Sequence, residues 1–109
     1  GNTIFDLFPD VQFYDYTKNY TIDMNLIPEN YHLTFSRNEE NADKVDMMMQ
    51  KGMNVAVVFR KELPKTYKGY KVINGDKHDL RFLDEKNVIV GLTAKGPAKK
   101  DKSGFVVDI

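Results

Sequence analysis

Apolar residues between positions 31 and 60 follow two different patterns, which predict two strands. Tyr31, Leu33 and Phe35 alternate with smaller or more polar residues, as in a strand with two distinct faces. Residues 55–59 form an unbroken apolar run, which is typical of a strand buried on both faces of a parallel sheet. Because parallel neighbours need a crossover connection, we predict a strand–helix–strand unit at the centre of the fold.

A short helix is predicted between these two strands. Its apolar positions fall on one helical face, which comprises Ala42, Val45, Met48 and Met49. Either Asn38 or Asn41 is suited to cap this helix, because an Asn side chain accepts hydrogen bonds from the free N–H groups of a first turn. Gly52 supplies a helix stop.

Shorter elements are predicted on both sides of this unit. They are a short helix capped by Thr3 and ended by Pro9, strands at 11–16, 70–73, 88–92 and 105–109, a turn at Asn74–Gly75, a helical turn at 80–83, and a basic, flexible loop at 96–104. The short strands around Tyr70 and Phe105 are candidates for an antiparallel pair at one edge of the sheet.

The predicted elements indicate an α/β fold with a small, mostly parallel sheet and a crossover helix, shaped like half a barrel and with a possible antiparallel edge. A chain of 109 residues suffices for one modest core, so we expect residues 1–109 to form a single α/β domain. Half a barrel leaves sheet edges and an apolar face uncovered. We therefore expect a homo-oligomer, most simply a dimer.

Composition narrows the range of partners and locations. The 16 basic and 16 acidic side chains cancel, so the net charge does not support nucleic acid or an anionic membrane as a partner. The absence of cysteine excludes disulfides and thiol catalysis within the chain. No apolar run reaches membrane-spanning length and no signal-peptide pattern opens the sequence, so a cytoplasmic location without membrane contact is expected.

Four basic residues follow the predicted parallel strands and are the candidate ligand-binding residues. They are Lys18, Arg37, Arg60 and Lys95. Ligands of parallel α/β sheets bind beyond the carboxyl ends of the strands, so these side chains are expected around one rim. Such a ring suits a phosphate or another anion. The alternative is that they are ordinary solvated loop residues.

The densest polar cluster lies at residues 75–81. Asp76, His78 and Asp79 are metal-ligand types, but their spacing matches no metal motif, so no metal is predicted. His78 and Asp79, together with Asp15 at the end of the first strand, are weak candidates for proton transfer. The sequence contains no glycine-rich phosphate or dinucleotide motif, and no cofactor is predicted.

Four segments carry a resemblance that extends over nearly the whole chain. They read FPDVQFYDYTKN, PENYHLTFSRNEEN, GMNVAVVFRKELPKTYKGYKVINGDKHDLRFLD and VIVGLTAKGPAKKDKSGFVVD. In order and spacing these segments resemble the C-terminal part of phage proteins of the gene product 88 type.

The resemblance implies a phage or prophage origin and a longer parent protein, in which a cysteine-bearing region precedes this part. It assigns no activity, so whether the chain is an enzyme stays open. The first hypothesis is a phage-related domain that is non-catalytic as an isolated chain. The alternative is part of an enzyme or binding module that acts on a phosphorylated ligand or nucleic acid at the carboxyl ends of the strands.

Overall fold

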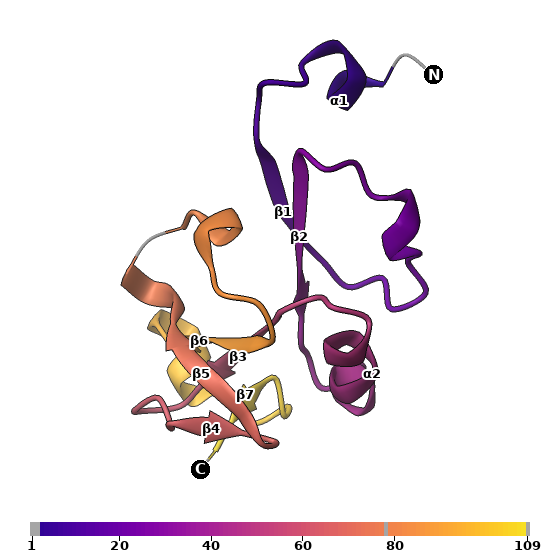
Figure 1. The fold of residues 1–109 in the computed structure, drawn as a ribbon. Helices are drawn as coiled ribbons and strands as arrows, with labels where there is room; N and C mark the ends of the chain where they lie inside the picture. The colour runs from indigo at the N-terminus through magenta and orange to yellow at the C-terminus, as the bar shows by residue number, and fades with distance from the viewer. Residues whose placement is uncertain (1–2, 78, 109) are drawn as a thin grey trace.

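The computed structural model describes residues 3–77 and 79–108, which fold around one open, seven-stranded sheet (Figure 1). The strands are β1 (Phe13–Thr17), β2 (Tyr31–Ser36), β3 (Val55–Phe59), β4 (Thr66–Tyr67), β5 (Tyr70–Asn74), β6 (Val88–Thr93) and β7 (Val106–Val107). The helices are α1 (Ile4–Leu7) and α2 (Val45–Gln50), with 3₁₀ turns η1 (Met24–Leu26), η2 (Ala42–Lys44), η3 (Gly75–Lys77), η4 (Arg81–Leu83) and η5 (Gly96–Lys100).

The sheet is mostly parallel, as the sequence predicts. Its strand order is β1-β2-β3-β6-β5-β4, and β7 pairs with β3 beside the end of β2. The predicted antiparallel pairing of the strands around Tyr70 and Phe105 is wrong. The strand that starts at Tyr70 pairs with β6 in parallel and with β4 in antiparallel, while β7 lies parallel to β3. The fold is thus α/β, with one antiparallel pair at its β4–β5 edge.

The helix of the central unit begins further along the chain than predicted, because neither Asn38 nor Asn41 caps it. Asn38 and Asn41 bond each other across the turn after β2, where each amide oxygen accepts from the other residue's backbone N–H at 2.8 and 2.7 Å. A 3₁₀ turn follows, and α2 starts at Val45 without a side-chain cap. The two side chains therefore stabilise the turn instead of capping the helix. Gly52 ends the helical segment with φ +95°, as predicted.

The main core lies between α2 and one face of the sheet. Val45, Met48 and Met49 are buried on the inner side of α2. They pack with Phe35 on β2, with alternate residues of β3 and with Ile89 on β6. The apolar face that the sequence predicts for the helix is therefore the face that closes the core.

The segment that carries η4 covers the other face of β1, β2 and β6, opposite α2 (Figure 1). Gly75 permits this packing because a β-carbon there would lie 2.5 Å from Val90 and 2.6 Å from the Arg81 guanidinium. The strands β1 and β2 extend beyond the rest of the sheet toward α1, where Thr3 and Asp6 form the predicted capping box. No helix in the described part of the chain has the length and apolar character that a membrane crossing requires.

Candidate functional site

The segments that follow the parallel strands meet at the carboxyl edge of the sheet, where the sequence predicts a site. An open hollow of about 440 Å³ lies there. It is lined by Lys18, Asn38, Glu39, Pro97, Ala98, Lys100, Asp101, Ser103 and Phe105. These residues come from the segments after β1, β2 and β6, so the hollow depends on the crossover topology.

Arg37 and Arg60 hold the C-terminal segment against this edge. Arg37 donates from Nη1 to the carbonyl oxygens of Gly104 and Phe105 at 2.7 and 2.8 Å. Arg60 forms an ion pair with Asp108 at 2.8 Å and donates to the carbonyl oxygens of Lys99 and Asp101 at 2.8 and 2.5 Å. Both guanidinium groups therefore bind the protein's own backbone and position residues 99–108.

Lys95 also bonds within the protein, but its acceptor is a carboxylate side chain. Its ammonium group lies 3.2 Å from a carboxylate oxygen of Asp76, and the other oxygen accepts from the hydroxyl and N–H of Thr93 at 2.8 and 3.0 Å. Burial raises the pKa of Asp76, but the hydrogen bonds from Thr93 and Lys95 outweigh burial and lower it overall. This network joins η3 to the end of β6.

Among the four predicted ligand-binding residues, Lys18 is the one that lines the open hollow without an ion pair to any described residue. The structure places Arg37 and Arg60 at the same edge, each with protein acceptors. Lys95 lies beside η3, paired with Asp76. The four side chains thus surround the predicted edge, but they differ in how much of their charge is available to a ligand.

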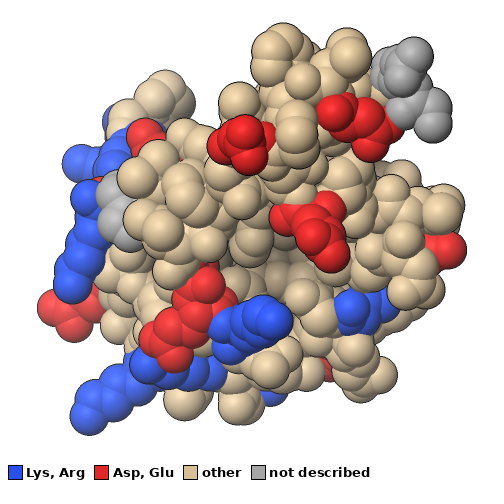
Figure 2. Space-filling view, turned by 45° about the horizontal axis from the view of Figure 1, so that its top comes forward, with Lys and Arg blue, Asp and Glu red and all other residues tan. Residues whose placement is uncertain are grey.

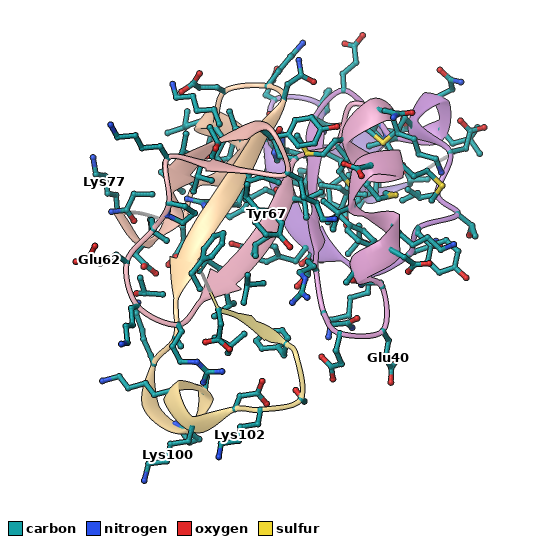
Figure 3. All side chains as sticks on the ribbon, turned by 90° about the horizontal axis from the view of Figure 1, so that it is seen from below. Glu40, Glu62, Tyr67, Lys77, Lys100 and Lys102 are labelled. Carbon is teal, nitrogen blue, oxygen red and sulfur yellow. The ribbon has the colours of Figure 1, made fainter. Side chains whose placement is uncertain are left out.

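Three lysines of the predicted basic loop at 96–104 lie next to the hollow. Lys99, Lys100 and Lys102 line a second, adjoining hollow of about 670 Å³ with Arg60 and Asp108. All three are exposed, and Lys100 and Lys102 project away from the body of the protein (Figure 3). We call Lys18, Lys99, Lys100 and Lys102 the carboxyl-edge surface.

A charge asymmetry along the chain is the sequence signal that points to this surface. Residues 1–50 carry nine acidic and three basic side chains, whereas residues 51–109 carry thirteen basic and seven acidic ones. The net charge of zero conceals this separation. Figure 2 shows it on one face, where basic side chains gather along the lower and left sides and the part near the N-terminus is mostly uncharged with separate acidic groups.

The two candidate proton-transfer residues that the structure describes do not lie at the carboxyl-edge surface. Asp15 lies on β1, where its carboxylate accepts from the N–H of Tyr16 at 2.8 Å. Asp79 follows η3, and its carbonyl oxygen accepts from the N–H of Arg81. Neither lines the two hollows. His78 lies outside the described residues.

A second group of charged side chains lies beneath η4. Arg81 is 1% exposed, and its Nε lies 3.3 Å from a carboxylate oxygen of Asp84, whose side chain is 3% exposed. Nearby, burial raises the pKa of Tyr16 although the Arg81 charge opposes this shift. Burial also lowers the pKa of His32, against the opposing effect of Asp84. No pattern in the sequence predicts a role for Arg81, Asp84 or Tyr16.

Metal chemistry has no ready ligand set in the described residues. Within residues 3–77 and 79–108, no three histidine, aspartate or glutamate side chains lie close enough together to hold an ion. The charged groups found there are suited to binding anions or to pairing with one another.

Comparison of the sequence with known proteins gives one match, which is to a family model. The family model described as Gene product 88 matches residues 2–109. No curated protein and no solved structure gives a significant match to the chain.

Proposed function

This chain belongs to the gene product 88 family, and we propose that it is a non-catalytic nucleic-acid-binding domain. Its carboxyl-edge surface contacts backbone phosphates. The proposal rests on one observation, which is that exposed lysines lie on a segment whose backbone is already fixed in place. Lys99, Lys100 and Lys102 lie on a short stretch whose carbonyl oxygens are bound by Arg37 and Arg60.

The two arginines favour binding by ordering the segment in advance. A flexible loop would lose backbone entropy when it closed on a ligand, and this loss weakens affinity. Here η5 and the arginine contacts already fix the backbone of residues 96–105, so the main remaining cost is the ordering of lysine side chains. The arginines therefore act as positioning residues, and the lysines are the phosphate-binding groups.

Charge distribution supports a polyanion as the ligand. The excess of basic residues after position 50 places the carboxyl-edge surface in the positive part of the protein. Lysine acts on phosphate as a point charge, and most lysine–phosphate contacts carry no base specificity. The lysines of this segment are not interleaved with aromatic residues, so base stacking is not part of the proposal.

Binding is favoured over catalysis at this edge because the two candidate proton-transfer groups among the described residues lie elsewhere. Asp15 and Asp79 line neither hollow. The hollows also contain acidic residues, Glu39 and Asp108 among them, which would repel a small and highly charged phosphate compound placed deep inside. An extended backbone that runs across the lysines avoids these carboxylates.

The test measures the anisotropy of a fluorescein-labelled DNA oligonucleotide as protein is added at several salt concentrations. Four lysine–phosphate contacts predict a slope of about −3 to −4 in log K against log salt for duplex DNA. Absence of binding at ~100 µM protein in low salt, or a slope near zero, would show that the proposal is wrong.

A matched pair of variants locates the contact. Lys100→Gln/Lys102→Gln is expected to reduce the magnitude of the salt slope by about 2. Lys65→Gln/Lys68→Gln removes the same charge from exposed positions near the β4–β5 turn and should leave the slope unchanged. Equal effects of the two variants would indicate a non-local charge effect. Equal competition by pyrophosphate and oligonucleotide, at matched phosphate concentration, would instead indicate a small phosphorylated ligand.

A further inference from the structure

An ion pair joins Arg60 and Asp108, the residues that directly follow β3 and β7. Nε of Arg60 lies 2.8 Å from one carboxylate oxygen of Asp108, and Nη2 lies 3.3 Å from the other. Among the described residues, Arg60 is the only hydrogen-bond donor to this carboxylate. A guanidinium fork binds carboxylate and phosphate in the same bidentate geometry. Asp108 therefore occupies a position that a phosphate group would fit.

The remaining donors of Arg60 are bound to the backbone. Nη1 donates to the carbonyl oxygen of Lys99, and Nη2 uses its second N–H for the carbonyl oxygen of Asp101. Departure of the Asp108 carboxylate would free Nε–H and one N–H of Nη2 without breaking either backbone contact. One guanidinium can therefore position the segment and bind an anion at the same time.

The ion pair is open to solvent, so a ligand can reach it. The Arg60 side chain is 21% exposed and that of Asp108 is 72% exposed. Both residues line a hollow of about 150 Å³ together with Lys61 and Glu62, and both also line the hollow of about 670 Å³ beside the carboxyl-edge surface. Exposed ion pairs contribute little to stability, so exchange of this carboxylate for another anion costs little.

Asp108 competes with a ligand for this position. The hydrogen bond from Arg60 lowers the pKa of Asp108, although burial opposes the shift, so the carboxylate is ionised near pH 7. A single anion in solution must displace a carboxylate that the chain holds at high local concentration. An extended chain of phosphates is held by the neighbouring lysines as well, so it competes through several contacts at once. Asp108 would therefore favour a polyanion over single anions.

We propose that the Nε edge of Arg60 is a phosphate subsite of the carboxyl-edge surface, closed by Asp108 in the free protein and opened when a phosphate of the ligand displaces this carboxylate. The inference rests on the proposed function for the class of ligand. It adds phosphate binding to the positioning role of Arg60, and it makes Asp108 a residue that sets affinity and selectivity. The displaced carboxylate moves into solvent, where it is hydrated.

The Nε–Hε resonance of Arg60 reports the exchange directly. In an NMR titration of the full chain with a DNA oligonucleotide, this resonance and the side-chain carboxyl carbon of Asp108 are expected to shift together. Shifts in the amides of residues 99–102 with both of these signals unchanged would overturn the subsite and leave the proposed function intact.

Pyrophosphate at ~10 mM is the second probe, and it separates the two proposals. A shift of the Arg60 signal with pyrophosphate, without any binding of the oligonucleotide, would refute the proposed function and support the phosphate subsite. No shift of the Arg60 signal with either probe would overturn the subsite.

A matched pair of variants tests the competition. Asp108→Asn removes the competing charge and keeps the size of the side chain, so affinity for the oligonucleotide at low salt should rise about 3-fold. Glu62→Gln removes the same charge from the same hollow without touching the ion pair and should change affinity less. Equal gains would overturn the inference, and so would lower affinity of Asp108→Asn with faster hydrogen exchange at residues 98–107, which would show that Asp108 only holds the segment in place.

Discussion

Arginine is held in different ways at the carboxyl edge after β3 and in η4 on one face of the sheet. At the carboxyl end, Arg60 has 21% of its side chain exposed and binds carbonyl oxygens and Asp108, which leaves nearby lysines in solvent. In η4, Arg81 is 1% exposed and is paired with Asp84. Exposed charge can be offered to a ligand at little desolvation cost, whereas buried charge must be balanced inside the protein.

This difference suggests a division of roles within one small sheet. The carboxyl-edge surface carries charge that salt can screen, so its effects should appear in binding and vanish at high ionic strength. The Arg81–Asp84 pair is shielded from solvent, so its effects should appear in stability and change little with salt.

The largest effect is expected from Arg81→Leu. Removing the guanidinium leaves the carboxylate of Asp84 buried without its ion-pair partner, which should lower the free energy of unfolding by about 3–5 kcal/mol. Urea unfolding monitored by circular dichroism measures this loss. Arg81→Leu/Asp84→Leu should recover part of it, because the second substitution removes the uncompensated charge.

An exposed ion pair is the control for this prediction. Lys71 and Glu85 lie 2.7 Å apart with side chains 61% and 56% exposed. Lys71→Met should therefore change the free energy of unfolding by less than ~1 kcal/mol. Similar losses for Arg81→Leu and Lys71→Met would contradict the distinction between buried and exposed charge.

A smaller loss is expected from Asp76→Ala, which removes the acceptor for Thr93 and Lys95. Loss of these hydrogen bonds should cost about 1–2 kcal/mol near pH 7. The folded pKa of Asp76 is lowered, so its contribution is complete above the unfolded pKa of about 3.9 and disappears as pH falls through the folded value. The difference between wild type and variant should therefore shrink as pH falls below about 3.9, and a constant difference would contradict this assignment.

Arg60→Gln should change local order more than global stability. Without the guanidinium, the carbonyl oxygens of Lys99 and Asp101 lose their donor, and the segment before β7 becomes easier to open. Hydrogen exchange should then speed up at the amides of residues 98–107 and remain unchanged in β2 and α2. Unchanged exchange in the C-terminal segment would show that Arg60 does not position it.

The dimer remains a prediction, and its expected signal is the weakest of this series. β1 lies at one edge of the sheet, and α1 beside it exposes Ile4 and Leu7, which are 53% and 62% accessible. A second copy would cover these apolar side chains and the free strand edge. Light scattering at increasing protein concentration should show the mass rising toward twice that of the chain, and a constant monomer mass would refute the dimer.

The centre of the fold could be predicted from sequence because its signals are local. The alternation at residues 31–35, the apolar run at 55–59 and the stop at Gly52 are each set by neighbouring residues. The placement of β7 could not be predicted in this way. It depends on Arg37 and Arg60, whose acceptors lie 39 to 68 positions further along the chain.

The sequence predicts an edge where a site should be sought, but not the partners of the residues around it. An open hollow lined by Lys18 lies at the carboxyl edge that the rule for parallel sheets indicates, and ligand binding there stays a prediction. Sequence alone does not distinguish an arginine that binds backbone carbonyls from one that is free for a ligand. Arg81 was missed for a related reason, because arginine in a short turn is usually exposed and its partner Asp84 gives no periodic signal.

The measurement that tests the central proposal most directly is an amide-detected NMR titration of the unmodified chain with a DNA oligonucleotide. The expected result is a set of shifts at Lys18 and residues 96–104, reversed by high salt, with His32 and Phe82 unaffected. Shifts confined to other parts of the chain, or shifts at residues 96–104 that persist in ~1 M salt, would contradict phosphate binding by the carboxyl-edge surface.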